Sequence, residues 1–475
     1  MIMTKGVVLV LAVSLLAGCG REKKLTSSSP EALRAYAAGV ASWEKFYYPE
    51  ARASFQHALQ LDSLFAMAWC RLAVVDASME NMPAASEAMH KAMAFAPGAT
   101  EREQLFITMW HRRLEFDNAG AAAAAESLLH LYPDEKEAYL FRGNLYEQIE
   151  KDYDAAVHYY QKAVDADTGY AQAVMSLGYA YSDLGDQQRA IEQMERYIRL
   201  APDAADPRAS LADLLFRAGR YDDALEQYRK SLELKPDYWY AIRQIGNVEA
   251  VLGRLHAAEE QYHKSMSFFP AGPQVDAFHL TADGLLSLAR HKFPEAAEQF
   301  RKALEIDSVN GSAAYGLAQA LIRMKQFDAA RMVVGRLHAE LTRRNLTHAP
   351  AMLSYHLMRA RLLAGEGNLD EALASCDSAL GYSAPLTRLP VYRQMAEIQL
   401  ARGAFENALD ACEEALVVNP NSPDVLLTLT RIYHGRGDTR MVVEIGSRLL
   451  ALWSEADRDF EDHNELLRLM GKKVP

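Results

Sequence analysis

The 475-residue chain has only four cysteines and none of the short motifs that mark common catalytic and metal sites. It contains no His-Glu-x-x-His, no Gly-x-Ser-x-Gly, no phosphate-binding glycine loop and no Cys-x-x-Cys. After the first 20 residues, no stretch approaches the ~18 consecutive apolar residues of a membrane helix. These absences predict a protein that is not an enzyme, uses no cofactor and no metal, and has no membrane helix in the body of the chain.

The chain also lacks an excess of positive charge. Its 51 Lys and Arg are outnumbered by 63 Asp and Glu, which gives a formal net charge of −12. A general nucleic-acid binder needs a basic surface, so this balance excludes nucleic acid as the partner. Half of the residues are hydrophobic, and the 26 Gly and 17 Pro concentrate at turns, which favours an all-helical folded chain.

Three residue classes recur with a period of 34 residues. Within each unit, a first helix carries a small residue in its middle, a glycine turn follows, and a second helix begins with an alanine. The positions that carry this period are Gly178, Ala212 and Gly246, then Ala190, Ala224 and Ala258, then Pro202, Pro236 and Pro270. A unit of two helices cannot bury its apolar face alone, so consecutive units are expected to stack.

A 34-residue unit with Leu-Gly early, Ala-x3-aromatic in the middle and Pro at the end resembles the tetratricopeptide repeat (TPR). The resemblance implies an all-α fold, an α-solenoid of about 12 helix-turn-helix units in a right-handed superhelix, in which each unit contacts only its neighbours. The small residue of the second helix is Ala51, Ala85, Ala121, Ala156, Ala190, Ala224, Ala258, Ala296, Ala330, Ala372, Ala408 and Val442. Four residues are inserted near Pro270 to Pro273, predicting a widened turn, and eight near His338 to Pro350, predicting an extended helix and a loop.

The N-terminus resembles a bacterial lipoprotein signal. Lys5 precedes an apolar run from Val7, and the run ends in Leu16-Ala17-Gly18-Cys19. The resemblance implies cleavage after residue 18, lipid on Cys19 and, because Gly20 rather than Asp follows, an outer-membrane destination facing the periplasm. An uncleaved membrane anchor is the alternative. The predicted organisation is a signal peptide at 1–18, a tether at 19–30, the TPR array at 31–454 and a capping helix with a tail at 455–475.

The isolated histidines and cysteines are predicted to be structural. His256 and His263 lie seven residues apart on a predicted second helix, but two ligands do not complete a metal site, so we interpret both as surface residues. Cys376 and Cys412 occupy equivalent helix positions in adjacent units. Packed helices lie ~8–10 Å apart, whereas a disulfide needs Cα atoms within ~7 Å, so both are predicted to be buried without a bridge.

The resemblance to TPR arrays implies a concave groove lined by first-helix residues. In this chain rings and arginines alternate along that line, which predicts binding of a protein or peptide partner that is acidic or bears carboxylates. The predicted groove residues are Tyr179, Phe216, Tyr240, Arg243, Asn247, Phe278, Tyr315, Arg323, Arg361 and Arg393. Alternatively, these arginines pair with Asp213, Glu397 and other acids inside the array. Arg243 and Asn247 also resemble the first pair of the chaperone-binding carboxylate clamp, but Ala282, Ser312 and Gly316 depart from the rest of that pattern.

A second resemblance concerns residues 30–167. The segments Pro30 to Tyr36, Ala99 to Glu103 and Leu129 to Pro133 look like TPR segments attached to bacterial receptor-type serine/threonine kinases and winged-helix regulators. Two functions therefore stay open. The first is a lipid-anchored adaptor that holds protein or peptide partners in the bacterial envelope, and the second is a detached sensory module of a membrane signalling or transcriptional regulator.

Overall fold

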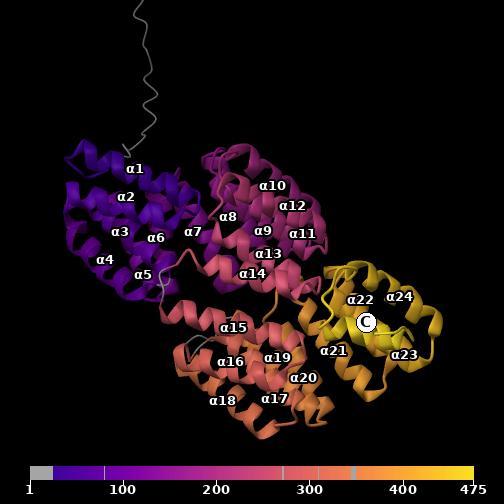
Figure 1. The fold of residues 1–475 in the computed structure, drawn as a ribbon. Helices are drawn as coiled ribbons and strands as arrows, with labels where there is room; N and C mark the ends of the chain where they lie inside the picture. Colours follow the sequence, from indigo (N-terminus) through magenta and orange to yellow (C-terminus); the bar gives the residue numbers. More distant parts are fainter. Residues whose placement is uncertain (1–24, 80, 270–271, 309, 344–348, 475) are drawn as a thin grey trace, which may run out of the picture. The chain divides into compact units, whose positions relative to one another are not determined.

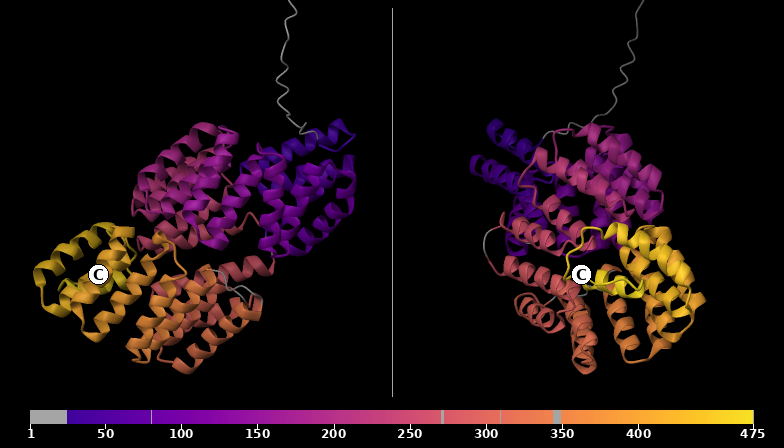
Figure 2. Two further views of the ribbon diagram at one scale, coloured as in Figure 1. Left: turned by 180° about the vertical axis from the view of Figure 1, so that it is seen from behind. Right: turned by 45° about the vertical axis from the view of Figure 1, so that its right-hand side comes forward.

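The computed structural model describes residues 25–79, 81–269, 272–308, 310–343 and 349–474, and every regular element in these ranges is a helix (Figure 1). The predicted signal peptide and Cys19 lie outside the described residues. Consecutive helices pair and pack side by side, as both views in Figure 2 show. Among the described helices, none combines the length and the hydrophobicity that a membrane-spanning segment requires.

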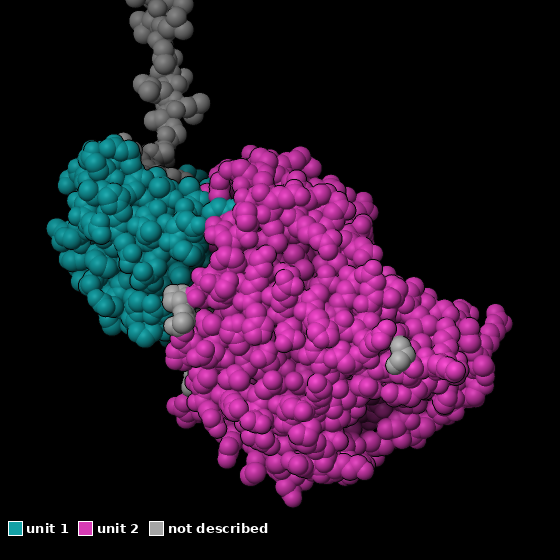
Figure 3. Space-filling view, in the orientation of Figure 1, with its two compact units in different colours: residues 1–43, 47–138 teal, residues 44–46, 139–475 magenta. Residues whose placement is uncertain are grey.

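The chain divides into two compact units (Figure 3). Unit 1 comprises the described residues up to 43 together with 47–138, and unit 2 comprises 44–46 together with the described residues from 139 onward. Unit 1 contains α1 (Pro30–Glu44), α2 (Tyr48–Leu61), α3 (Ala66–Ser78), α4 (Met82–Phe95), the short 3-10 helix η1 (Ala96–Gly98), α5 (Glu101–Leu114) and α6 (Asn118–Leu131). The boundary between the units falls inside α7 (Lys136–Leu145).

Unit 2 continues the same alternation of helices. The odd-numbered helices are the first helices of the repeats, and the even-numbered helices are the second. Its elements are the π-helix η2 (Tyr146–Glu150), α8 (Tyr153–Ala166), α9 (Ala171–Asp183), α10 (Gln187–Leu200), α11 (Asp206–Arg217), α12 (Tyr221–Leu234), α13 (Trp239–Val251), α14 (Leu255–Met266), α15 (Pro273–Ala289), α16 (Phe293–Ile306), α17 (Gly311–Arg323), α18 (Phe327–Arg343), α19 (Ala349–Gly365), α20 (Leu369–Leu380), the 3-10 helix η3 (Pro385–Thr387), α21 (Leu389–Arg402), α22 (Phe405–Val418), α23 (Pro423–Arg436), α24 (Thr439–Leu452) and α25 (Glu461–Leu469).

The turn between the two helices of a unit is set by one residue in the left-handed region of φ. These residues are Phe46, Phe116, Lys151, Gly185, Gly219, Gly253, His291, Lys325, Gly367, Gly403 and Gly437. Each lies five positions before the small second-helix residue predicted from the sequence, and residue 80, the equivalent in the remaining unit, is outside the described residues. The turn geometry therefore follows the predicted register through both inserted segments.

Close contact between paired helices requires the small residues that the sequence repeats. Ala224 is fully buried on α12, and a Cβ atom at Gly246 on α13 would lie only 2.8 Å from Cε1 of Tyr262 on α14. A side chain at Gly246 would therefore displace the Tyr262 ring and separate the helices. The predicted all-α fold of TPR helical hairpins is confirmed.

The two predicted insertions can be compared only in part, because residues 270–271 and 344–348 lie outside the described residues. The first lies between the end of α14 at Met266 and the start of α15 at Pro273, and the second lengthens α18 to 17 residues, ending at Arg343. Residues 344–348 lie outside the described part of the chain. The buried Cys376 and Cys412 are both free, in agreement with their interpretation as small core residues, and burial raises the pKa of each thiol to about 12.

The prediction that each helix-turn-helix repeat contacts only the adjacent repeats is wrong for the repeats in unit 2. The backbone N–H of Asp457 donates to the carbonyl oxygen of Gly253 at 2.9 Å, and Trp453 Nε1 donates to the carbonyl oxygen of Val251 at 3.0 Å. Residues 453–460, here called the C-terminal loop, thus pack on the turn between α13 and α14. This approach depends on Gly253, because a Cβ atom there would lie 2.4 Å from the ring of Phe460.

Candidate functional site

The first part of the predicted groove is organised around the buried carboxylate of Asp213 on α11. Tyr179 on α9 and Tyr240 on α13 donate to Asp213 Oδ2 at 2.9 and 2.7 Å, and Tyr228 donates to Oδ1 at 2.5 Å. Gln244 Nε2 donates to the same Oδ1 at 3.2 Å. Because Asp213 lies 34 residues after Tyr179, equivalent faces of successive first helices meet here.

Burial keeps these tyrosines neutral and therefore able to donate. Removal from water, followed by the nearby Asp213 charge, raises the pKa of Tyr179 and of Tyr240 well above the ordinary value. Both side chains are half-buried, so each ring retains exposed surface beyond its hydrogen bond. The arrangement fixes two rings from two first helices in one orientation.

Arg243 lies on α13 beside Tyr240, one of the tyrosines that donate to Asp213. Its guanidinium carbon is 4.9 Å from the ring centroid of Trp239 and 5.8 Å from that of Tyr240. Among the described residues, no carboxylate lies within ion-pair distance of Arg243. Stacking on two rings therefore orients the charge without neutralising it.

Asn247, Phe278 and Phe216 continue the row but have internal contacts. Asn247 donates to Gln244 at 2.5 Å and accepts from Tyr262 at 2.9 Å, so its amide is engaged within the fold. Phe278 packs edge-on against Tyr262, and Phe216 packs edge-on against Tyr221. Both phenylalanine rings are half-buried and so keep some apolar surface exposed on α11 and α15.

In the second part of the predicted groove, the arginines pair with acids of the array, which is the alternative that the sequence left open. Arg361 Nε on α19 donates to Gln394 at 3.0 Å, and Glu397 lies 3.8 Å from its Nη2. Arg393 on α21 contacts both Glu397 and Asp424, and the Asp424 charge raises the pKa of Arg393. These two arginines are therefore paired with acids inside the array.

Tyr315 and Arg323 belong to α17 and lie apart from each other. The guanidinium carbon of Arg361 lies 5.5 Å from the ring centroid of Tyr315. Arg323, at the exposed end of α17, stacks on Phe293 at 4.6 Å and has no ion-pair partner among the described residues. The structure thus brings Tyr179, Tyr240, Arg243 and Asn247 together, joins Tyr315, Arg361 and Arg393 in a second group, and places Arg323 at a helix end.

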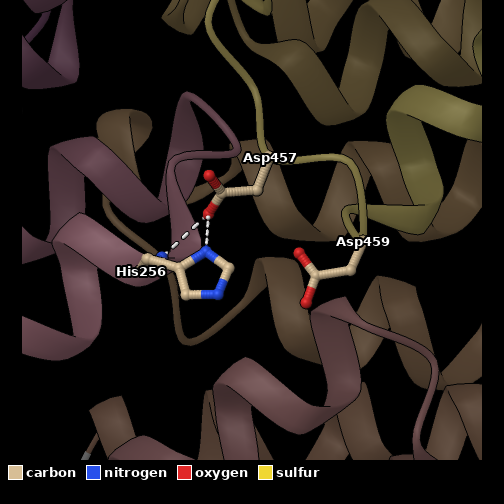
Figure 4. A group of neighbouring side chains, drawn as sticks. All are labelled: His256, Asp457 and Asp459. Atoms are coloured by element: carbon tan, nitrogen blue, oxygen red, sulfur yellow. Dashed lines mark hydrogen bonds and ion pairs between the residues drawn. The ribbon is translucent and has the colours of Figure 1, made fainter. Parts of the chain in front are cut away.

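A polar cluster that sequence reasoning missed lies where the C-terminal loop meets α14 (Figure 4). Asp457 Oδ2 accepts from both the backbone N–H and the ring Nδ1 of His256, each at 2.8 Å. Asp459 accepts from Arg290 Nε at 2.8 Å. No signal in the sequence pairs these residues, because His256 and Asp457 are 201 positions apart and outside the repeat period.

Comparison with known proteins supports the repeat assignment. Residues 117–171 and 150–205 match the tetratricopeptide repeat family, and residues 207–378 match a family described as the TT21 fifth ARM repeats domain. No curated protein matches the chain.

Two solved structures show the extent of the similarity. A crystal structure of MamA protein is 26% identical, covers 35% of this chain and 90% of its own, and has a TM-score of 0.29. A tetratricopeptide repeat protein from Parabacteroides merdae ATCC 43184 is 20% identical, covers 55% of this chain and 98% of its own, and has a TM-score of 0.37. The match to the tetratricopeptide repeat family, and not these two structures, shows that the chain contains TPR-type repeats, as predicted from the 34-residue period.

Proposed function

We propose that the chain is a lipid-anchored interaction scaffold of the bacterial envelope that binds an acidic or carboxylate-bearing peptide along the first helices α9 to α15. The observation that carries this proposal is the guanidinium of Arg243, which stacks on Trp239 and Tyr240 and has no carboxylate partner among the described residues. In a chain of net charge −12, an unneutralised arginine held by rings is a site for an incoming carboxylate.

The neighbouring side chains suit a peptide rather than a small anion. Tyr179 and Tyr240 are fixed by Asp213, and Phe278 adds a third half-buried ring. Fixed rings offer contact area at low entropic cost, while Arg243 supplies the charge that selects the partner. Arg361 and Arg393 already have acids beside them, so we assign the partner's carboxylate to Arg243 and not to these two.

The test uses peptide pairs that differ only in the C-terminal group, a free carboxylate or an amide, and measures binding to the full-length protein by fluorescence anisotropy. We expect acidic peptides to bind, the free carboxylate to bind more tightly, and Arg243→Gln to weaken binding by ~10-fold or more, since loss of a charge partner costs ~2 kcal/mol or more. Arg189→Gln is the matched control, because Arg189 stacks on Tyr181 but lies on a second helix and is paired with Asp186. Equal weakening in both variants would exclude the Arg243 site.

The lipid anchor is tested separately. Lys5, the apolar run and Leu16-Ala17-Gly18-Cys19 support acylation of Cys19 and placement at the outer membrane facing the periplasm. Three acyl chains exceed the two that stable attachment requires. Cys19→Ser is expected to move the protein from the membrane fraction to the soluble fraction, whereas continued membrane sedimentation with unchanged processing would exclude the anchor.

A further inference from the structure

Two pairs of side chains of the types that bind metals lie on the neighbouring helices α14 and α15, one pair on each helix. Glu259 and His263 lie four residues apart on α14, and His279 and Asp283 lie four residues apart on α15. Residues at this spacing share one face of a helix. Because α14 and α15 are consecutive, packed helices, the two pairs lie opposite each other on rigid elements.

The distances suit a single small cation. One ligand atom from each of Glu259, His263 and Asp283 lies within 4.8 Å of the other two. His263 Nε2 is 3.3 Å from Asp283 Oδ1. A tetrahedral zinc ion with bonds of about 2.0–2.2 Å separates its ligand atoms by about 3.3–3.6 Å, so this pair already has the spacing of two ligands. The ring of His279 stacks on that of His263 at 4.6 Å between centroids and so helps to orient the His263 imidazole.

Two of these side chains have buried polar atoms without a hydrogen bond. Asp283 Oδ1 and His279 Nδ1 are buried and have no hydrogen-bond partner among the described residues. The 3.3 Å approach of His263 to Asp283 lacks the alignment of a hydrogen bond, as expected where both atoms face a third point. An unsatisfied buried polar atom destabilises the folded state, and a bound cation would remove that penalty.

The charges around the site favour a cation. Glu259 and Asp283 supply two carboxylates, and Asp276 acts electrostatically on His279. Arg290 is the opposing charge and contacts Glu259 Oε2 at 3.3 Å, but Asp459 holds Arg290 at 2.8 Å on its other side. The other carboxylate oxygen of Glu259 makes no hydrogen bond or ion pair with the described residues, so it is available as a ligand.

The cluster of His256, Asp457 and Asp459 also has metal-ligand chemistry but differs in one respect (Figure 4). Asp457 already accepts two hydrogen bonds from His256, and Asp459 is paired with Arg290. A cation there would have to break these contacts. We therefore treat this cluster as an attachment of the C-terminal loop and use it as the control.

We propose that the chain binds one Zn²⁺ ion between α14 and α15 through Glu259, His263 and Asp283, with water as the fourth ligand. Mixed imidazole and carboxylate ligands favour Zn²⁺ over Mg²⁺ and Ca²⁺, which prefer oxygen ligands alone. This proposal departs from the sequence-based prediction of no metal site, which considered His263 only with His256 and not with Glu259 on the same helix or Asp283 on the next.

The test titrates Zn²⁺ into the metal-free full-length protein against a chromophoric chelator. We expect one ion per chain. His263→Ala and Asp283→Asn should each weaken binding at least ~10-fold, since even loss of a group that only supports a ligand costs ~10–100-fold. Substituting Co²⁺ should give the intense visible absorption of a four-coordinate ion in the wild type, and this absorption should be lost in both variants.

The paired control is His256→Ala combined with Asp457→Asn, which should leave Zn²⁺ affinity unchanged. Glu259→Gln, a surface change, keeps the test decisive if a variant at His263 or Asp283 loses helix content by circular dichroism. The proposal is overturned if the wild type does not compete with the chelator, if His263→Ala and Glu259→Gln bind as the wild type does, or if only the control variant loses binding.

Discussion

At the scale of single residues, the most informative positions are the left-handed residues between the two helices of each unit. Glycine adopts this conformation freely, but another residue loses about 1–2 kcal/mol there. Gly185 has φ +85°, and a Cβ atom added to it would meet no other atom within 4 Å, so only its backbone requires glycine. Phe116 adopts the same conformation without being glycine and is 65% exposed.

We predict opposite effects for two glycine substitutions. Gly185→Ala should lower the free energy of unfolding by about 1 kcal/mol, because alanine is strained at positive φ. Gly335→Ala, inside α18 with ordinary φ and open space around it, should raise it by about 0.5–1 kcal/mol, because alanine favours helix. Urea denaturation followed by circular dichroism measures both, and effects of equal sign would contradict the turn assignment.

Asp206 on α11 gives a pH-dependent prediction. Burial raises the pKa of its carboxyl from 3.8 to about 6, although Tyr238 and Tyr197 donate to it at 2.7 and 2.9 Å. The folded state therefore binds a proton more readily than the unfolded state between pH ~4 and ~6, and stability falls as pH rises through that window. Asp206→Asn should remove about 3 kcal/mol of this decline. The measurement is the urea midpoint of both proteins from pH ~4 to ~7. If the two midpoints change with pH in the same way, the raised pKa of Asp206 is contradicted.

At the scale of helices, the sequence predicted the pairing well because each unit repeats the same local chemistry. The small residues from Ala51 to Val442 all lie five positions after a left-handed turn wherever that turn is described. Tyr179 and Tyr240 lie 61 residues apart and so occupy different positions of the 34-residue unit, which is why the period did not predict that both donate to Asp213. The partners of the arginines were harder to predict, since Arg243 and Arg393 occupy similar helix faces and differ only in whether an acid lies nearby.

Helix packing can be tested at Ala224, which is fully buried where α12 packs against its neighbours. Ala224→Phe should lower the free energy of unfolding by ~1–3 kcal/mol, because the ring forces the helices apart. Met332→Phe is the matched control, because Met332 on α18 is 58% exposed. Urea denaturation measures both variants, and an equal effect at the two positions would mean that α12 is not closely packed at Ala224.

At the scale of the whole chain, unit 2 is more than a row of independent repeats. Asp457 of the C-terminal loop contacts His256 on α14, and Asp459 contacts Arg290, the residue that follows α15. Tyr221 Oη also donates to the carbonyl oxygen of Asn421 at 3.2 Å. No period relates these partners, so a single sequence could predict α25 as a terminal helix but not the surface on which the preceding loop packs. These contacts couple the stability of repeats far apart in sequence.

Two glycine substitutions distinguish the contact between Gly253 and the C-terminal loop from backbone strain in the turn alone. Gly253→Ala should be strained by its φ of +75° and should also push its Cβ atom into Phe460 and Ala456, at 2.4 and 2.9 Å. Gly403→Ala, at φ +79° with open space around it, has the strain alone. Gly253→Ala should therefore destabilise by ~1–3 kcal/mol more than Gly403→Ala.

The site of that excess is measurable by hydrogen exchange. In Gly253→Ala, the amide of Asp457, which donates to Gly253, and the amides of α25 should exchange faster, while those of α9 keep their protection. In Gly403→Ala, the Asp457 amide should stay protected because its acceptor is unchanged. If Asp457 exchanges equally in both variants, the C-terminal loop does not depend on the glycine at 253, and the coupling between distant repeats must be carried by other contacts.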